Sequence, residues 1–224
     1  MHDGHRQRLK NRFLTEGLDN FEAHAVLELV LFYALPRQDV NPLAHELINR
    51  FGKLSAVFDA PIEALMKTPG IGEHAAALIK LIPALCRRYQ VSRIEGEQIL
   101  NTTSRAGAYL LPRFFAHKNE VVYLVCLDSK CKVLGCTLLF EGSVNSAGVS
   151  VRKIVETALG FNATGVILAH NHISGVALPS ADDEKTTAHI KTALRAVGIR
   201  LNDHLIVADG DFVSMADSGY LSDG

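Results

Sequence analysis

Two histidines and one aspartate stand at a spacing that can bind a metal ion. His170 and His172 close an apolar segment, and Asp183 follows after ten intervening residues. On a β-strand, residues i and i+2 point to the same face, so the two imidazoles are expected to lie together. Two histidines and one carboxylate leave a fourth tetrahedral position for water, as in catalytic zinc sites. The sequence therefore predicts one Zn²⁺ per chain.

The same residues also allow a purely structural interpretation. Ser180 lies three residues before Asp183, which is a capping pattern typical of a helix start. Asp183 could serve there alone, although its two oxygens allow capping and metal binding together. Either histidine alone could be an ordinary strand-end residue, but the joint pattern favours the metal site.

The elements around these residues alternate between helix and strand. Periodicity and turn signals predict helices at 105–115, 151–160 and 180–197 and strands at 121–128, 131–140, 164–172, 200–207 and 212–215. Such alternation is typical of an α/β (α+β) domain in which helices flank a mixed sheet. The carboxyl end of one strand and the start of the next helix would then position the three ligands.

The first half of the chain has a different pattern. Residues 21–91 repeat apolar side chains at helical spacing between Pro and Gly breakers, which predicts a small helical bundle. A polar stretch at 90–104 suggests a boundary near residue 100, and thus domains at 1–100 and 101–224.

Residues 65–80 read as helix, tight turn and helix, similar to a helix-hairpin-helix DNA-binding element. Gly70 and Gly72 would let the backbone approach a phosphate, and Lys80 would add charge. A plain packing turn is the alternative, because residues 1–100 hold twelve Lys and Arg against twelve Asp and Glu. The basic start of the chain could likewise be a solvated helix face.

Composition limits the remaining function classes. The 224 residues are 48% hydrophobic with a net charge of −1, so a sizeable core is expected and no global field favours nucleic acid. No apolar run is long enough for a membrane span and no export signal is evident, so we expect a cytoplasmic protein with reduced thiols.

The cysteines carry no metal-binding spacing. No C-x-x-C pair occurs, which argues against a zinc ribbon and against cytidine-deaminase chemistry. Cys126, Cys131 and Cys136 are therefore interpreted as buried strand residues. Asp203 and His204 are either a hydrogen-bonded core pair or a pair that supports the metal ligands.

The ligand pattern resembles the JAMM motif of MPN metalloproteases. Nearly the whole chain resembles the bacterial RadC (UPF0758) family, through residues 4–9, residues 27–33 and the motif at 170–172. The resemblance implies an MPN/JAB-type domain of cytidine-deaminase-like architecture. The family usually has a proline after the second histidine and Asp-Pro further on, where this chain has Ile173 and Val176-Ala177. This departure concerns the shape of the loop and its substrate edge.

The resemblance also implies site roles and partners. Glu120 corresponds to the family's upstream glutamate, which takes a proton from water and hands it to the leaving amine. Ser180 would donate a hydrogen bond to the developing oxyanion. A solvated Glu120 beside Lys118 is the alternative.

The implied activity is zinc-dependent hydrolysis of an amide or isopeptide bond. A DNA-associated accessory protein with a structural or vestigial metal site is the second hypothesis. The expected partners are a peptide or protein substrate and, through the helical half, DNA. No membrane is expected, and an oligomer is compatible with the sequence.

Overall fold

The computed structural model describes residues 2–94, 96, 98–142 and 150–221. The chain divides into two compact units, Met1–Cys86 and Arg87–Gly224, and the division falls inside one helix. Each unit is described by itself. None of the described helices combines the length and apolar character needed to cross a membrane.

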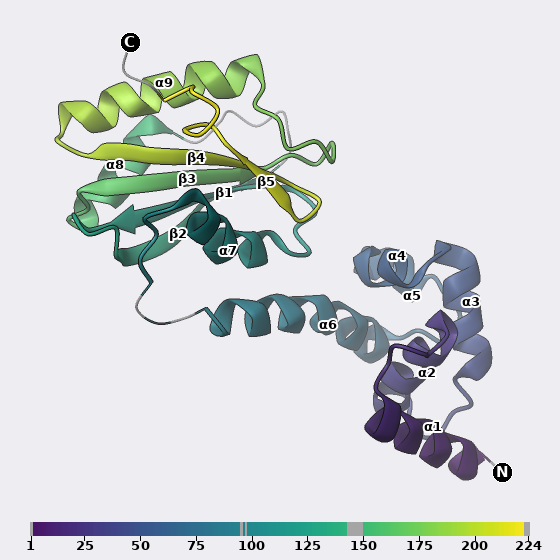
Figure 1. The fold of residues 1–224 in the computed structure, drawn as a ribbon. Helices are drawn as coiled ribbons and strands as arrows, with labels where there is room; N and C mark the ends of the chain where they lie inside the picture. Colours follow the sequence, from purple (N-terminus) through teal and green to yellow (C-terminus); the bar gives the residue numbers. More distant parts are fainter. Residues whose placement is uncertain (1, 95, 97, 143–149, 222–224) are drawn as a thin grey trace. The chain divides into compact units, whose positions relative to one another are not determined.

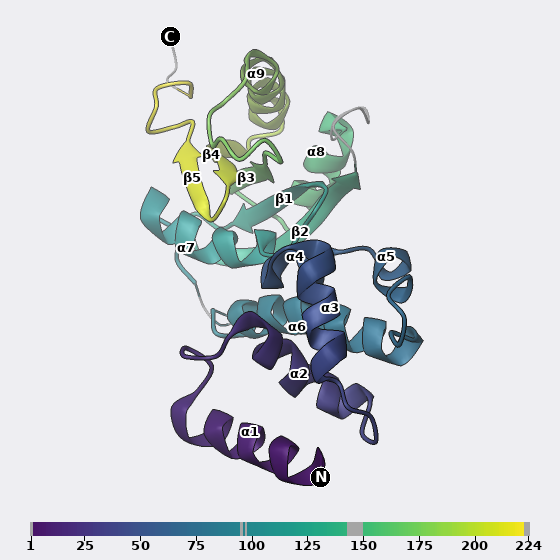
Figure 2. The same cartoon turned by 90° about the vertical axis from the view of Figure 1, so that its right-hand side faces the viewer.

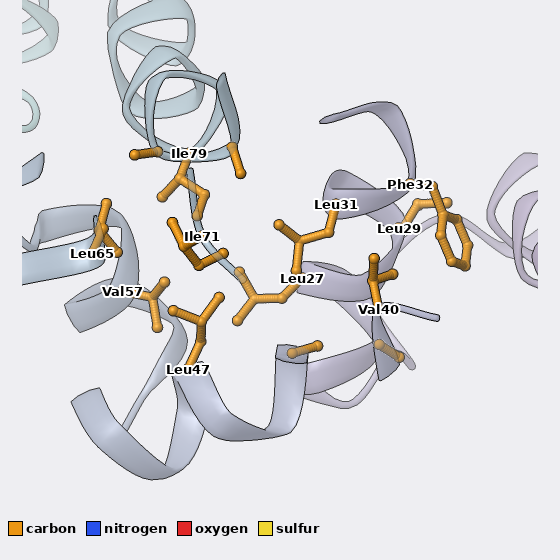
Figure 3. Packing of buried hydrophobic residues seen from close by; sticks show 14 of the residues in the cluster. Leu27, Leu29, Leu31, Phe32, Val40, Leu47, Val57, Leu65, Ile71 and Ile79 are labelled. Atoms are coloured by element: carbon orange, nitrogen blue, oxygen red, sulfur yellow. The ribbon is translucent and has the colours of Figure 1, made fainter. Parts of the chain in front are cut away.

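The first unit is a bundle of helices, as predicted. Its elements are α1 (His2–Glu16), α2 (Ala23–Ala34), α3 (Asn41–Phe51), α4 (Leu54–Asp59), α5 (Ile62–Met66) and the first part of α6 (Glu73–Ser92). The apolar positions of α2 and α3 meet those of α5 and α6 in one core, with Leu27, Leu47 and Ile79 fully buried (Figure 3). Burial of such side chains supplies the main favourable free energy of folding.

A buried polar cluster ties α1 to α2 and α3. Glu28 is only 2% exposed, and its carboxylate accepts hydrogen bonds from His5 Nε2 at 2.8 Å and from Asn41 Nδ2 at 3.0 Å. The Arg6 guanidinium donates to the carbonyls of Leu35 and Gln38 at the end of α2. His5, Arg6 and Glu28 belong to the segments that resemble the RadC family, and their contacts hold helices of the bundle together.

The second unit is a mixed sheet with helices on both faces, as predicted (Figure 1). Its elements are α7 (Thr103–Phe114), β1 (Glu120–Leu127), β2 (Val133–Gly142), α8 (Val151–Gly160), β3 (Gly165–Asn171), α9 (Ala181–Ala196), β4 (Arg200–Ala208) and β5 (Asp211–Ser214). The strand order is β2-β1-β3-β4-β5, and only β3 and β4 are parallel. Helix α9 forms the crossover between them, as a parallel pair requires.

Each face of the sheet has its own core. Helix α7 covers one face, while α8 and α9 cover the other (Figure 2). Along β1, Val121 and Val125 point to α7, whereas Leu124 points to α8 and α9. Helix α7 approaches closely at Gly107, where an added Cβ would lie 2.2 Å from the Phe212 ring.

The prediction for the cysteines is wrong in part. Cys126 is a fully buried strand residue, but Cys136 is only partly buried. Cys131 lies in the turn before β2, at a φ of 60°. The turn extends further than expected because the Asp128 carboxylate accepts hydrogen bonds from the amides of Lys130 and Lys132. Strand β2 therefore starts at Val133.

Candidate metal centre

The three predicted ligands come together at the carboxyl end of β3. His170 Nε2 lies 3.0 Å from His172 Nε2 and 3.1 Å from Asp183 Oδ1, and His172 Nε2 lies 3.3 Å from Asp183 Oδ2. They are the one group of three or more His, Cys, Asp or Glu residues suited to a metal among the residues that the structure describes. Strand β3 ends at Asn171, one residue earlier than predicted, so His170 lies in the strand and His172 just beyond it, and with Asp183 of α9 they aim three ligand atoms at one point.

The start of α9 explains how Asp183 reaches this point. Ser180 and Asp183 form a complete capping box: Ser180 Oγ accepts from the Asp183 amide, and Asp183 Oδ2 accepts from the Ser180 amide at 2.8 Å. Ser180 Oγ also donates to Oδ2 at 2.6 Å. The capping and ligand geometries therefore coexist on one carboxylate, and the capping box orients it.

A chain of hydrogen bonds sets the tautomer of His170. Thr187 Oγ1 lies 2.6 Å from the Asp183 main-chain carbonyl oxygen. A carbonyl oxygen can only accept, so the Thr187 hydroxyl donates its proton to this hydrogen bond. Thr187 Oγ1 must then accept from His204 Nδ1, which is also 2.6 Å away. Burial lowers the pKa of His204 well below its usual value and the neighbouring His170 lowers it further, so this imidazole is neutral.

A neutral His204 that donates from Nδ1 has a lone pair on Nε2. His204 Nε2 lies 2.8 Å from His170 Nδ1 and accepts a hydrogen bond from the N–H at that position. His170 Nε2 is consequently left with its lone pair directed at Asp183 and His172. The chain from Thr187 through His204 thus prepares His170 to bind a cation, as partners of metal-bound histidines commonly do.

A main-chain carbonyl sets the tautomer of His172, so that Nε2 can act as the ligand atom here as well. Its Nδ1 lies 3.2 Å from the Val176 carbonyl oxygen, which can only accept, so Nδ1 carries the proton and Nε2 the lone pair. A main-chain carbonyl makes this contact, and the side chain at 176 does not. The side chain that departs from the family's usual sequence at 176 therefore takes no part in this contact.

The resulting cluster needs a positive charge. Two imidazole lone pairs and a carboxylate face one another within 3.0–3.3 Å, an arrangement that only a metal cation or shared protons stabilise. Burial on its own raises the pKa of Asp183, but the contacts of its carboxylate with His170 and Ser180 outweigh burial and hold that pKa well below its usual range, so the carboxylate is ionised. The donor set of two nitrogens and one oxygen fits zinc.

Glu120 lies at the start of β1, on the same face of the sheet as His170. Val122 is the direct cross-strand partner of His170, and Glu120 stands two residues before Val122. Because side chains alternate along a strand, Glu120, Val122 and His170 share the face covered by α8 and α9. The strand that begins at Glu120 lies directly beside the histidine strand.

Asp203 and His204 are a buried, hydrogen-bonded pair, since the Asp203 carboxylate accepts from the His204 main-chain amide at 2.7 Å, but their side chains have different roles. His204 points to the metal ligands, whereas the Asp203 carboxylate accepts from the Ser214 hydroxyl at 2.7 Å and from the Ala216 amide at 3.0 Å. Neighbouring strand residues face opposite sides of a sheet, which separates their roles. Thr187 and His204 are thus the supporting residues, and sequence reasoning missed the first entirely.

The proposed DNA-contacting residues lie in the turn between α5 and α6 and in α6 itself. Gly70 has a φ of 92°, which favours glycine, and Gly72 has open space around its Cα. Lys80 Nζ donates to the Phe58 main-chain carbonyl at 2.7 Å and is thereby directed into the bundle. Glu73 places a negative charge in the first turn of α6. These contacts favour a packing role for the turn.

A mixed sheet between helices, with a His-x-His pair at a strand end and an aspartate that caps the crossover helix, defines a JAB-type (MPN) domain. Residues 100–220 match the sequence model of the RadC-like JAB domain. The chain belongs to the RadC family, also called UPF0758. It is 35% identical to a UPF0758 protein of Ruegeria pomeroyi over 97% of both chains. It is 34% identical to a UPF0758 protein of Azotobacter vinelandii over 96% of both chains, and 35% identical to one of Photobacterium profundum, again over 96% of both.

Proposed function

We propose that the JAB domain is a zinc-dependent hydrolase of amide or isopeptide bonds. The observation that carries the proposal is the convergence of three ligand atoms whose lone pairs are set by their own hydrogen-bond partners. His170, His172 and Asp183 would hold the ion. When bound, Zn²⁺ supplies a Lewis acid for the carbonyl and lowers the pKa of a coordinated water to roughly 7.

The protein's remaining role would be to move protons, and we assign it to Glu120, which lies on the face of the sheet that holds His170. Its carboxylate starts from the face that holds His170, so it would accept the proton of the attacking water. It would then deliver this proton to the nitrogen of the leaving amine, as general acid-base catalysis requires. Because it stands outside the ligand triad, it leaves the fourth coordination position open for chemistry.

Ser180 has two roles to reconcile. The Ser180 hydroxyl donates a hydrogen bond to Asp183 Oδ2, which supports a role for Ser180 in positioning the ligand carboxylate. Donation to an oxyanion would require that the hydroxyl rotate away from Asp183. A Ser180→Ala variant that loses zinc affinity supports the positioning role, whereas one that keeps zinc and loses turnover supports the oxyanion role.

The proposal is tested with zinc-loaded full chain and a mixture of peptides and lysine-linked isopeptides, with cleavage followed by mass spectrometry. We expect cleavage that a chelator abolishes, and a loss of at least about 100-fold in rate for Glu120→Gln at unchanged zinc content. Glu156→Gln, an exposed carboxylate on α8, is the matched control. A zinc-loaded wild type that cleaves nothing in the mixture would refute the proposal.

The DNA-associated accessory role stays a prediction beside this one. The wild-type chain and Glu120→Gln should then bind duplex DNA equally, and biological activity should survive the substitution. Loss of biological activity in Glu120→Gln, with zinc and DNA binding intact, would favour the hydrolase.

A further inference from the structure

A cavity of the second unit opens beside the metal centre. Its volume is about 720 Å³, within the range of about 300–1,000 Å³ that is typical of ligand pockets. His172 forms part of its wall, so one residue belongs to both the metal centre and the cavity. The cavity therefore adjoins the candidate metal centre at His172.

The position in the fold agrees with a binding role. The cavity lies between the end of α7, the end of β3 and the β4–β5 turn. The carboxyl ends of adjacent parallel strands, here β3 and β4, are the places where open α/β sheets bind their ligands. The metal ligands lie at the end of β3 as well, so the metal centre and the cavity occupy one edge.

The walls of the cavity are mainly apolar. Its apolar lining is formed by Leu111, Pro112, Phe114, Phe115, Ile173 and Val207. Phe115 is 43% exposed and Ile173 is 53% exposed, so two large apolar side chains meet solvent at this site. Exposed apolar side chains gathered at a pocket mark a surface that binds an apolar partner group.

The Asn171 side chain in the wall has its hydrogen bonds satisfied within the domain. The Asn171 amide oxygen accepts from the Val121 amide at 2.7 Å, and its nitrogen donates to the Asn119 carbonyl. Burial, followed by the charge of Arg87, lowers the pKa of His117, which keeps that imidazole neutral. Lys118 and Asp209 also line the cavity, and their opposite charges give no net preference for an ion.

A tight turn fixes the aromatic wall. The His117 amide donates to the Phe114 carbonyl at 3.2 Å, while Phe115 has φ −56° and ψ 131° and Ala116 has φ 61°. These angles define a type II turn, which usually has glycine where this chain has Ala116. The turn presents Phe115 at its first corner and so holds the ring beside the cavity.

We propose that this cavity is a specificity pocket that receives an apolar side chain of a peptide substrate, next to the bond that is cleaved. The proposal rests on the proposed hydrolase function for the identity of the bond. What the pocket adds to that function is a preference for an apolar residue, and this preference can be measured by binding alone.

The binding test uses the fact that the chain contains no tryptophan. Zinc-loaded full-length Phe115→Trp carries a single fluorescent reporter in the pocket wall. Titration with N-acetyl-leucinamide should give a saturable change in emission. N-acetyl-aspartamide should bind at least about tenfold more weakly, because only the leucine side chain gains from apolar burial.

Leu178→Trp is the matched control, since Leu178 is 62% exposed on the same loop as Ile173 but does not line the cavity. It should not respond to either probe. Ile173→Trp provides a second reporter from another wall, in case a tryptophan at 115 fills the space itself. Equal affinity for the two probes, or saturable binding at neither pocket reporter in folded protein, would overturn the proposal.

Hydrolysis separates failure of the pocket from failure of the proposed function. Binding of the leucine probe without cleavage of any peptide retains the pocket and refutes the hydrolase. Chelator-sensitive cleavage with no preference for apolar residues retains the hydrolase and refutes the pocket. If both hold, Phe115→Ala should lower kcat/KM for the preferred substrate about tenfold at unchanged zinc content.

Discussion

The two units of this protein each contain a cluster of histidine and carboxylate groups, but the clusters differ in how their protons are arranged. In the helical unit, Glu28 accepts from His5 and Asn41, so every contact pairs a donor with an acceptor. In the JAB domain, His170, His172 and Asp183 present acceptors to one another. The first cluster is complete as it stands, whereas the second needs a metal cation or shared protons between its acceptors. Residue types alone do not distinguish these cases.

The largest expected effect is a difference in zinc affinity between variants of two neighbouring aspartates. Asp183→Asn should lower zinc affinity by more than about 100-fold, because it removes one of three ligands and the negative charge that offsets the ion. Asp182→Asn should leave affinity unchanged, because that side chain is 92% exposed and pairs only with Lys185. Zinc competition with a chromophoric chelator measures both. A full complement of tightly held zinc in Asp183→Asn would contradict the assignment.

The next effect tests the hydrogen-bond chain behind His170. Thr187→Val removes the acceptor of His204 Nδ1 while it preserves shape, so His170 is no longer held as the Nε2 ligand. We expect zinc affinity to fall about 10–100-fold. Thr192→Val on the same helix is the control, since its hydroxyl contacts only the Ala188 carbonyl. Equal affinities in the two variants would show that the chain has no part in metal binding.

A third variant examines the completed cluster of the helical unit. Glu28→Gln keeps the shape of the side chain but exchanges a charged acceptor for an amide, at an expected cost of about 1.5–3 kcal/mol in the free energy of unfolding. Zinc stoichiometry should not change, because the residue belongs to the other unit. Urea denaturation followed by circular dichroism gives the cost. An unchanged midpoint would mean that the buried carboxylate contributes little to the bundle.

The smallest expected difference is in the rate at which two thiols, one in each unit, are alkylated. Burial, together with the nearby Cys136, raises the pKa of Cys126 to about 11, so its thiolate is scarce at pH 8. Cys86 on α6 is exposed. We expect iodoacetamide at pH 8 to label Cys86 first and to spare Cys126 until the domain unfolds. Peptide mapping by mass spectrometry measures both rates, and rapid labelling of Cys126 in folded protein would contradict its burial.

Much of the fold and part of the site follow from local patterns in the sequence. Alternation along 164–172 placed two imidazoles at one predicted strand end, and the Ser180–Asp183 spacing located the start of α9. Both are signals within one element or at its boundary. The mixed sheet followed from the same alternation of elements.

What the sequence did not reveal depends on contacts between elements. Thr187 on α9 meets His204 on β4, and no local pattern marks either residue for this contact. The period of two along β4 did hold one unused signal: adjacent residues face opposite sides, so Asp203 and His204 could not both support one metal. The type II turn at Ala116 also escaped notice, because sequence preference places glycine there.

The shortness of the chain between the ligands has a consequence for how the domain folds. Only ten residues separate His172 from Asp183, and the supporting His204 follows within the same strand–helix–strand unit. The entropy lost on closing a loop grows with its length, so this closure is among the less costly long-range contacts of the domain. We expect a cation to bind while β1, which brings Glu120, is still undocked. Zinc should then accelerate refolding, because the contacts that it stabilises form before the rate-limiting step.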